Sequence, residues 1–429
     1  MGLPVYILGS GASGLAAARL AASEGREGYL ISEKAPAAAL LPELSGWGFG
    51  WRPELPVDEE GEWILSPGFA EDHAWVTHLR ARGVSLIPEF AYGARRLQGQ
   101  QVAITGSLGK TSMVLLAEAL LRDAGYTVTV SGNIGRPVSE VALKAAQGDF
   151  HVLELSSFQL EGNEDYRPDR AICLNLFPNH LDRHGSMEAY AQAKARLFSY
   201  QTPEDKAVWP EGFPVASACA AQKGNVHELC LPALSGSAFE RGGLRENLRM
   251  LFAGLEGIPG VSAERQASVI RGFSFPAHRQ QRLDIRGAGL VIDDSKSTCL
   301  SATRGAVEGT GGALQLVMGG IDKAEDLTQL LPLFRERNPE LYLFGRAAKK
   351  MRRVWQDSVD VCETHDTLDD ALLALWETRT KAQTLLFSPG CASFDQFSGY
   401  EARGQHFQAL VSRLAAQSPI SRNDEKETL

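Results

Sequence analysis

The stretch AITGSLGKTSMVLLAEALLRDAGY, residues 103–126, starts as a short apolar run and continues as a helical pattern. Between them lies TGSLGKTS, residues 105–112, with two glycines, a lysine and several hydroxyl side chains. N–H groups at a helix start point outward, and the helix dipole favours an anion there. The G-x-x-G-K-T spacing is shorter than G-x-x-x-x-G-K-[ST], whose first glycine would fall at Ile104. We nevertheless predict an ATP phosphate loop rather than a glycine-rich turn with a solvated lysine. Lys110 would reach the outer phosphates, and Thr111 or Ser112 would offer a hydroxyl to Mg²⁺.

Strand-like runs alternate with helical patterns on both sides of this loop, which predicts an α/β fold with parallel sheets. The tail 418–429 is polar and is expected to be disordered. Residues 40–60 look like loop, and residues 203–245 have no clear pattern. The strand-like runs are LPVYIL (3–8), YLISEK (29–34), ILSPG (64–68), VAIT (102–105), YTVTV (126–130), HVLELSS (151–157), RAICLNL (170–176), GLVIDD (289–294), LQLVMGG (314–320), LYLFG (341–345) and TLLFSPG (384–390).

Bulk properties exclude several classes of function. The formal net charge of −9 argues against a nucleic-acid partner, because phosphate contacts need clustered lysine and arginine. No apolar run approaches the roughly 20 residues that span a bilayer, and the start lacks the basic region of a signal peptide. The six cysteines are scattered without a C-x-x-C pair, which is typical of reduced thiols in a cytoplasmic protein.

A second glycine motif, GSGASG at 9–14, follows the first strand-like run, and Glu33 comes about 20 residues later. This pattern fits G-x-G-x-x-G. Taken alone it is compatible with NAD, FAD, another nucleotide, or close packing of a helix on a strand. A nucleotide-dependent oxidoreductase therefore stays open at this point.

Two further residues could hold a metal ion. Glu154 lies in an apolar run, where a charge is costly to bury unless it is paired or bound to a metal. His180 follows another strand-like run. Each could be structural, Glu154 in a core ion pair and His180 as an ordinary histidine. A carboxylate, an imidazole and a loop hydroxyl at neighbouring strand ends would suit Mg²⁺ beside ATP.

The order of the motifs along the chain resembles the Mur ligase family. The motifs are TGSLGKTS, SGNIGRP (131–137), LELSSFQLE (153–161), NLFPNHLDRHGSMEAYAQAKARLF (175–198), DDSKST (293–298), MGGIDK (318–323) and SPGCASFDQF (388–397). The resemblance implies three domains. These are a Rossmann-like UDP-substrate domain at 1–97, a P-loop ATPase-like parallel-sheet domain at 98–275, and a Rossmann-like amino-acid-binding domain at 276–429.

The family implies an ATP-dependent amide ligase of cytoplasmic peptidoglycan precursor synthesis. A substrate carboxylate attacks the γ-phosphate of ATP, and an amine then displaces phosphate from the acyl phosphate. LSSFQLE, DRHGSMEAY and CASFDQF resemble the type that joins D-glutamate to UDP-N-acetylmuramoyl-L-alanine. L-glutamate or another acidic amino acid is the alternative substrate. The resemblance also implies Mg²⁺ as cofactor and a monomer.

Residue roles carry over motif by motif. The implied catalytic residues are Lys110, Glu154, His180 and Lys194. Glu154, His180, Thr111 and Lys194 would hold metal, and Lys194 matches the family's carbamylated lysine. The implied ATP contacts are Gly106, Ser107, Leu108, Gly109, Lys110, Thr111, Ser112, Asn247, Arg279 and Asp294. The implied UDP-substrate contacts are Gly11, Ala12, Ser13, Ser32, Glu33, Lys34, Ser66, Pro67, Gly68 and Asn133. The implied amino-acid contacts are Lys296, Thr298, Lys323, Ser393, Phe394 and Tyr400.

The chain departs from the family pattern at four positions: Leu108 in the phosphate loop, Asn179 before His180, Leu244 before Arg245-Glu246-Asn247, and Cys299 after DDSKST. A catalytically inactive binding protein is therefore a third interpretation. The family's lysines and its buried glutamate are all present, which favours an active enzyme.

Overall fold

A computed structural model describes residues 3–417 except 57–59, 146, 215–218, 225, 227–230, 232–233, 235–236, 238, 240–241, 324 and 381. The chain forms two compact units. The first comprises Met1–Phe177, Arg183–Glu240 and Leu244–Phe273, and the second Pro178–Asp182, Arg241–Gly243 and Ser274–Leu429. The polar tail predicted at 418–429 lies outside the described residues. The predicted domain bounds at 97/98 and 275/276 stay predictions.

The first sheet of the first unit is parallel, with strand order β3-β2-β1-β4-β5. This order confirms the Rossmann-like fold expected of the N-terminal part. Its strands are β1 (Val5–Leu8), β2 (Gly28–Ile31), β3 (Phe49–Arg52), β4 (Glu62–Leu65) and β5 (Leu86–Pro88). Its helices are α1 (Ala12–Ser23), α2 (Leu41–Gly46), α3 (Ala74–Ala81) and α4 (Glu89–Ala94).

The loop expected at 40–60 is wrong, because this segment contains α2 and β3. Two of the residues that suggested a loop have other uses. Pro42 lies in the first turn of α2, where its missing N–H is not needed. Gly50 lies in β3, opposite Tyr29 of β2, and pairing with that neighbouring strand outweighs the weak local preference.

The second sheet of the first unit is also parallel, with order β11-β10-β9-β6-β8-β7. Its strands are β6 (Gln98–Thr105), β7 (Val128–Gly132), β8 (Gln147–Glu154), β9 (Arg170–Cys173), β10 (Lys206–Val208) and β11 (Gln222–Lys223). Its helices are α5 (Lys110–Asp123), α6 (Val138–Ala145), α7 (Ser157–Leu160), α8 (Leu181–His184), α9 (Met187–Ala195), α10 (Gly242–Leu255) and α11 (Ala267–Gly272).

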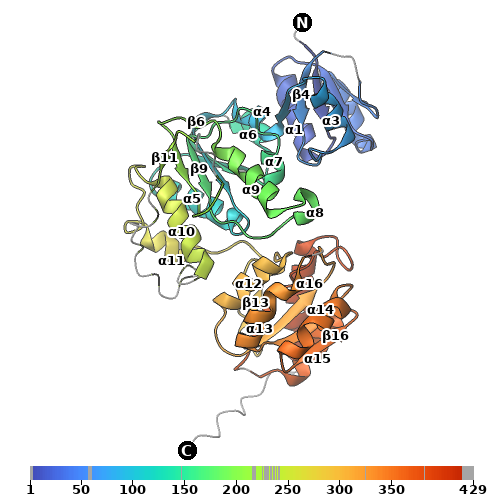
Figure 1. Cartoon of the computed structure of the whole chain (residues 1–429), viewed down its shortest axis with the longest axis vertical. Coiled ribbons are helices and arrows are strands. Elements are labelled where there is room, and N and C mark those ends of the chain that lie inside the picture. The colour runs from blue at the N-terminus through green and yellow to red at the C-terminus, as the bar shows by residue number, and fades with distance from the viewer. Residues whose placement is uncertain are drawn as a thin grey trace, which may run out of the picture. The chain divides into compact units, whose positions relative to one another are not determined.

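The two sheets of the first unit share one hydrophobic core. A single cluster of buried side chains runs from Val5 and Leu20 through Phe90 to Val138 and Leu153. Helices α1, α4 and α6 pack on one another where the sheets meet (Figure 1). Gly93 allows α4 to approach α6 closely, because a Cβ there would lie 2.5 Å from the backbone N of Ser139. The first 97 residues are thus continuous in packing with those that follow.

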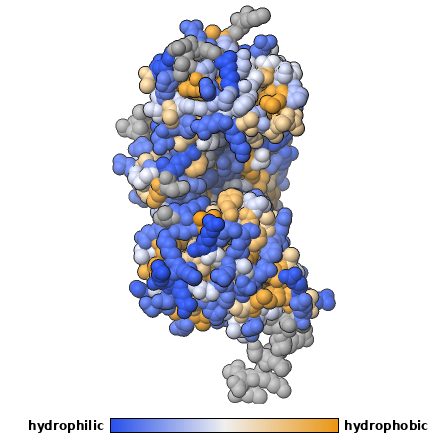
Figure 2. All heavy atoms as spheres, turned by 90° about the vertical axis from the view of Figure 1, so that its right-hand side faces the viewer, coloured by the Kyte–Doolittle hydropathy of each residue, from blue (hydrophilic) through white to orange (hydrophobic). Residues whose placement is uncertain are grey.

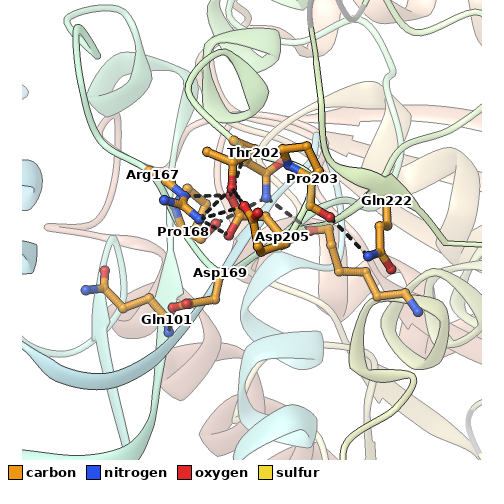
Figure 3. Close-up of polar contacts among 11 residues, drawn as sticks. Gln101, Arg167, Pro168, Asp169, Thr202, Pro203, Asp205 and Gln222 are labelled. Carbon is orange, nitrogen blue, oxygen red and sulfur yellow. Dashed lines mark hydrogen bonds and ion pairs between the residues drawn. The ribbon is translucent and has the colours of Figure 1, made fainter.

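A polar cluster joins the strands of the second sheet at their amino ends (Figure 3). Arg167 donates two hydrogen bonds to the buried carboxylate of Asp205, at 2.6 and 3.0 Å. Asp169 accepts from the N–H of Gln101 at 2.7 Å, and Gln222 donates to the Pro203 carbonyl at 3.0 Å. These contacts lie at the opposite ends of the strands from the phosphate loop.

The second unit holds a sheet with order β12-β13-β17-β14-β15-β16, in which only β12 is antiparallel to its neighbour. Its strands are β12 (Gln281–Leu283), β13 (Val291–Asp293), β14 (Leu314–Gly319), β15 (Glu340–Phe344), β16 (Cys362–His365) and β17 (Thr384–Phe387). Its helices are α12 (Leu300–Gly309), α13 (Leu331–Arg337), α14 (Ala348–Trp355), α15 (Leu368–Thr378) and α16 (Tyr400–Gln417). Helices cover both faces of the sheet, over two separate buried clusters.

The face shown in Figure 2 mixes hydrophilic residues with small apolar patches. In the part of the chain that the structure describes, no helix is both long and apolar enough to cross a bilayer. The five cysteines described are free thiols, as the sequence predicts, and Cys230 lies outside the described residues.

Candidate active site

The predicted phosphate loop lies between β6 and α5, at the carboxyl edge of the second sheet. Gly109 has φ 79° and precedes the first residue of α5. A Cβ at Gly109 would meet the Asn247 amide nitrogen at 2.4 Å, so conformation and space both require glycine. No side chain caps the start of α5, and the start of a helix favours an anion. The Lys110 ammonium donates to the carbonyls of Gly106 and Ser107, at 2.8 and 3.1 Å.

Two asparagines hold the loop from outside. The Asn175 side-chain oxygen accepts from the backbone N–H groups of Ser107 and Leu108, at 3.1 and 2.9 Å. Its amide nitrogen donates to the Leu108 carbonyl at 2.9 Å and to the Asn247 side chain at 2.8 Å. The family resemblance implies that Asn247 contacts ATP, and here Asn247 also supports the loop through Asn175. The N–H groups of Ser107 and Leu108 are therefore used inside the protein.

Glu154 ends β8 beside the loop and is 2% exposed. Its carboxylate accepts from the Thr111 hydroxyl at 2.8 Å and from the Asn133 amide at 3.0 Å. Three predicted residues thus meet at one point, although Asn133 was assigned to the UDP substrate. Burial of a carboxylate without a cationic partner in contact costs free energy, so this arrangement suits a group that binds a cation in its working state.

Lys194, on α9, is 1% exposed and reaches the same loop. Its ammonium donates to the Gly106 carbonyl at 2.9 Å and lies 3.5 Å from the Thr105 hydroxyl. Within the described residues it forms no ion pair with a carboxylate. Burial, with a smaller effect from the charge of Lys110, holds the pKa of Lys194 well below its ordinary value. A neutral amine at this position is the form that can add carbon dioxide.

The oxygen donors near the loop fit a hard cation such as Mg²⁺, which prefers carboxylate and hydroxyl ligands. Glu154 and the Thr111 hydroxyl supply two such groups. Among the described residues no three histidine, cysteine or acidic side chains gather as a metal cluster. His180 lies in Pro178–Asp182, which groups with the second unit, so its place beside Glu154 stays a prediction.

The predicted UDP contacts, apart from Asn133, converge at the carboxyl edge of the first sheet. Gly9 follows β1, Ser32 follows β2 and Ser66 follows β4. A Cβ on Gly14 would lie 2.0 Å from the Gly9 carbonyl oxygen, so this glycine allows α1 to approach β1. The buried Ser66 hydroxyl has no hydrogen-bond partner among the residues that the structure describes. The start of α1 has no side-chain cap, which leaves donors for a pyrophosphate.

In the second unit, Asp294 and the predicted amino-acid residues follow β13, β14 and β17, whereas Arg279 precedes β12. The Lys296 ammonium lies 3.8 Å from the centre of the Tyr400 ring, and Lys323 donates to the Thr298 hydroxyl at 3.3 Å. Ser393 is buried, whereas Phe394 is 70% exposed. Lysine ammonium groups beside hydroxyls suit a dicarboxylate. The structure does not place Arg279 or Asp294 relative to the phosphate loop, which belongs to the other unit.

Asp294 and its neighbours form a buried polar network. Burial raises the pKa of Asp294 to about 7, although the hydroxyls of Ser297 and Ser388 oppose this shift. The Nδ1 atom of His278 lies 2.6 Å from a carboxylate oxygen of Asp293, the residue before Asp294. Arg403, on α16, is fully buried and donates to the carbonyls of Ser295 and Cys391, at 2.7 and 3.0 Å. Arg403 thereby fixes the segments that follow β13 and β17.

A cavity of about 370 Å³ lies at the carboxyl ends of β15 and β16. Arg346, Lys349 and His365 line it, together with Asp366 and Asp395. It contains none of the predicted amino-acid contacts, so size alone does not identify the reactive site. The convergence of the predicted residues at other strand ends is better evidence.

Three of the four departures from the family pattern have visible surroundings. Leu108 contributes its backbone N–H and carbonyl to the Asn175 contacts, which any side chain would allow. Cys299 is buried at the start of α12 and contacts the Ser301 hydroxyl at 3.4 Å. The Asn179 side-chain oxygen is buried, and within the described ranges it has no hydrogen-bond partner. Nothing in the structure explains Leu244.

Sequence reasoning missed Asn175, Tyr190 and Arg403. Asn175 stands inside a quoted motif, two residues after β9, and a polar residue directly after a strand beside a phosphate loop is a usable signal. The Tyr190 hydroxyl donates to Ser107 of the loop at 3.0 Å. Arg403 lies on a helix whose pattern gives no sign of a fully buried guanidinium.

Comparisons with known proteins bear on the family of the chain. The family model described as Mur ligase middle domain matches residues 104–230. A UDP-N-acetylmuramoylalanine–D-glutamate ligase from Acidobacterium capsulatum is 34% identical over 449 residues, covering 96% of both chains. One from Desulfovibrio desulfuricans is 34% identical and covers 97% of both chains.

Solved structures with the same fold include the MurF ligase of Thermotoga maritima in complex with ADP. It aligns with a TM-score of 0.62 at 14% identity, over 94% of this chain and 99% of that one. The E. coli FolC structure with DHPP and ADP aligns with a TM-score of 0.55 at 17% identity, over 76% of this chain and 92% of that one. Full-length relatives above 30% identity, together with the three predicted α/β parts, show the family. The chain therefore belongs to the Mur ligase family.

Proposed function

We propose that this chain joins D-glutamate to UDP-N-acetylmuramoyl-L-alanine at the expense of ATP. The substrate carboxylate attacks the γ-phosphorus and ADP leaves, which gives an acyl phosphate. The glutamate amine then attacks the acyl carbon, and inorganic phosphate leaves as the amide forms. The observation that carries the proposal is the phosphate loop with Lys110, Glu154 and Lys194 converging on it. Relatives bearing the ligase name over the full chain length support the substrate assignment.

The residues of the loop would do most of the electrostatic work. The uncapped start of α5 offers N–H groups to the phosphates, and Lys110 needs only to leave the Gly106 and Ser107 carbonyls to reach an outer phosphate. Nucleophile, leaving group and transferred group are all anionic, so preorganised positive charge lowers the barrier. Asn175 keeps the loop backbone in place while Lys110 moves.

Mg²⁺, when bound, would neutralise charge on the phosphates. Glu154 and the Thr111 hydroxyl would hold it, with His180 as the further ligand that the family implies. Lys194 as a carbamate would add two oxygens and replace a positive charge by a negative one. The burial of Lys194 and the lowered pKa of its amine support this modification, since an ammonium beside a cation would repel it.

The second unit would bind glutamate. Lys296 and Lys323 would contact its carboxylates, and the hydroxyls of Thr298 and Ser393 would orient it. Arg279 and Asp294 would contact ATP. The monomeric state and the cytoplasmic location predicted from the sequence stay predictions.

The comparisons do not support the oxidoreductase interpretation of GSGASG, because the relatives are named as ligases. The turn after β1 would instead receive the UDP pyrophosphate. A purified sample without flavin absorbance and without NAD binding would agree with this.

A coupled assay for phosphate release tests the proposal. With ATP, Mg²⁺ and UDP-N-acetylmuramoyl-L-alanine, we expect turnover on adding D-glutamate and little on adding L-glutamate. The reverse preference would transfer the assignment to an L-glutamate ligase. Absence of turnover with either amino acid would favour the inactive binding protein.

A further inference from the structure

A chain of polar contacts connects the predicted UDP-substrate loop to the segment that carries Glu154. Its centre is Arg183, the third residue of α8, whose guanidinium lies 2.6 Å from the Glu161 carboxylate. The same guanidinium donates to the carbonyls of Pro67 and Phe69, at 3.3 and 3.2 Å. It also lies over the Phe158 ring, 4.0 Å from its centre. Arg183 therefore contacts both the loop after β4 and helix α7.

The other oxygen of the Glu161 carboxylate continues the chain. It lies 3.3 Å from Nδ1 of His184, and Nε2 of the same ring lies 2.9 Å from the Ser157 hydroxyl. Ser157 is the first residue of α7 and follows Glu154 by three positions. We call the four residues Arg183, Glu161, His184 and Ser157 the Arg183–Ser157 chain.

The Arg183–Ser157 chain also lies against the phosphate loop. The His184 ring packs against the Tyr190 ring, with their centres 5.1 Å apart, and the Tyr190 hydroxyl donates to Ser107 of the loop at 3.0 Å. One set of contacts thus runs from the backbone carbonyls of Pro67 and Phe69 to the Ser107 side chain of the loop that would hold ATP.

Burial makes these contacts specific. Ser157 is 2% exposed, and the side chains of His184 and Glu161 are 4% and 10% exposed. Burial raises the pKa of Glu161, and the Arg183 guanidinium opposes that shift. A buried carboxylate that loses its cationic partner is strongly destabilised, so Glu161 and Arg183 depend on one another.

Ser157, His184 and Glu161 follow the contact order of a hydrolase triad, but a nucleophile must reach its substrate. Ser157 is enclosed at the start of α7, so this arrangement orients groups and does not attack one. Hydrophobic side chains of similar volume could replace the buried Arg183–Glu161 ion pair at similar stability, so stability alone does not explain its presence. The loop contacts of Arg183 point to a role in placing substrate.

We propose that Arg183, Glu161 and His184 are positioning residues that fix the 66–69 loop relative to α7. The UDP-sugar held by that loop then presents its carboxylate beside Lys110 and Glu154. This inference rests on the proposed ligase function and adds determinants of nucleotide-sugar affinity to it. The Arg183 guanidinium is the group that contacts both sides, through the Pro67 and Phe69 carbonyls of the loop and the Phe158 ring of α7.

The proposal predicts which binding constant changes. Glu161→Gln removes the charge that holds Arg183 while keeping the shape of the side chain. We expect its Kd for UDP-N-acetylmuramoyl-L-alanine, measured by calorimetry, to rise about 10- to 100-fold. The KM for ATP should stay within about twofold, since the Asn175 contacts to the phosphate loop are untouched. Arg183→Lys should show a smaller rise in this Kd, because lysine keeps the charge but lacks the planar guanidinium that donates to several acceptors at once.

Two controls separate positioning from general damage. Arg167→Lys breaks a comparable two-bond contact with a buried carboxylate, Asp205, at the opposite ends of the strands (Figure 3). It should lower the thermal midpoint without changing the Kd for the nucleotide sugar. The double variant Glu161→Gln/Arg183→Lys should lose less than the product of the two single effects, because both act on one contact.

The outcomes are distinguishable from a failure of the proposed function. If the parent protein does not bind UDP-N-acetylmuramoyl-L-alanine, both the proposed ligase function and the positioning role are wrong. If the parent binds it and Glu161→Gln and Arg183→Lys bind it equally well, only the positioning role is wrong. An equal rise in the KM for ATP would also overturn it, because that result indicates a general effect on the fold.

Discussion

Lys194 gives the sharpest test of the site, because its modified and unmodified forms have opposite charges. A lysine of ordinary pKa, about 10.4, has roughly one neutral amine in 800 at pH 7.5. Carbon dioxide adds only to the neutral form. Each pKa unit removed by burial increases that fraction about tenfold, and the pKa of Lys194 lies well below its ordinary value. The protein environment therefore increases the share of neutral amine at Lys194, which is the form that carbamylation requires.

Lys194→Ala should lower turnover by about 10²- to 10³-fold, the usual cost of losing one charge-stabilising group. The loop should keep its shape in this variant, because Lys110 still donates to the Gly106 carbonyl. Acetate or formate in the buffer should restore part of the activity by supplying the missing carboxylate. Lys194→Arg should stay inactive, since arginine keeps a positive charge and does not form the carbamate.

The assay measures phosphate release with and without acetate for each variant. Lys144→Ala is the matched control, because it removes a lysine with a half-exposed side chain on α6. Its turnover should equal that of the parent, and acetate should not alter it. Carbon NMR of the parent with labelled bicarbonate should show one carbamate signal that Lys194→Ala lacks. If Lys194→Arg were as active as the parent, Lys194 would serve only as a positive charge and the reasoning would be refuted.

Three further changes test other parts of the chain. Lys110→Ala should lower turnover about 10²- to 10³-fold, and near-normal phosphate release would contradict the phosphate-loop assignment. Lys323→Ala should raise the KM for glutamate more than that for ATP; a selective rise for ATP in the same steady-state assay would mean that the second unit was misassigned. Burial raises the pKa of Glu89 to about 7, so the folded state loses stability relative to the unfolded state as pH rises from about 4.5 to 7. We therefore expect the free energy of unfolding of Glu89→Gln, relative to that of the parent, to be up to about 3 kcal/mol higher at pH 8 than at pH 4.5. Urea unfolding at the two pH values measures this difference, and the same pH dependence in both proteins would rule it out.

The sequence predicted those elements whose local pattern and tertiary environment agree. The central strands are short apolar runs that are buried in the structure, and the G-x-x-G-K-T turn has a backbone shape that few other sequences adopt. Strand β3 was missed because its residues resemble a loop, and only pairing with β2 makes them a strand. The phosphate-loop residues were predicted correctly as a strand–loop–helix unit, while their roles stay predictions.

Positions that act through long-range contacts were harder to predict. Arg183 and Glu161 both stand in recognised motifs, yet their contact joins residues 22 positions apart, and the Arg183 contacts to Pro67 and Phe69 join more distant segments. Fully buried Arg403 contacts Ser295, which is 108 positions away. No periodic pattern records such pairings. Asn247 illustrates the opposite case, in which a motif located the residue and the structure added a contact with Asn175.

The shared core of the two sheets in the first unit has a consequence for how the protein unfolds. Leu20 and Phe90 from the first 97 residues belong to the same buried cluster as Val138 and Leu153. Cutting the chain at residue 97 would expose apolar surface on both fragments, so neither should be stable alone. Cooperative melting follows the packing and not the number of sheets. Scanning calorimetry should therefore show the N-terminal and central sheets melting in one transition, even though the family resemblance predicts two separate domains.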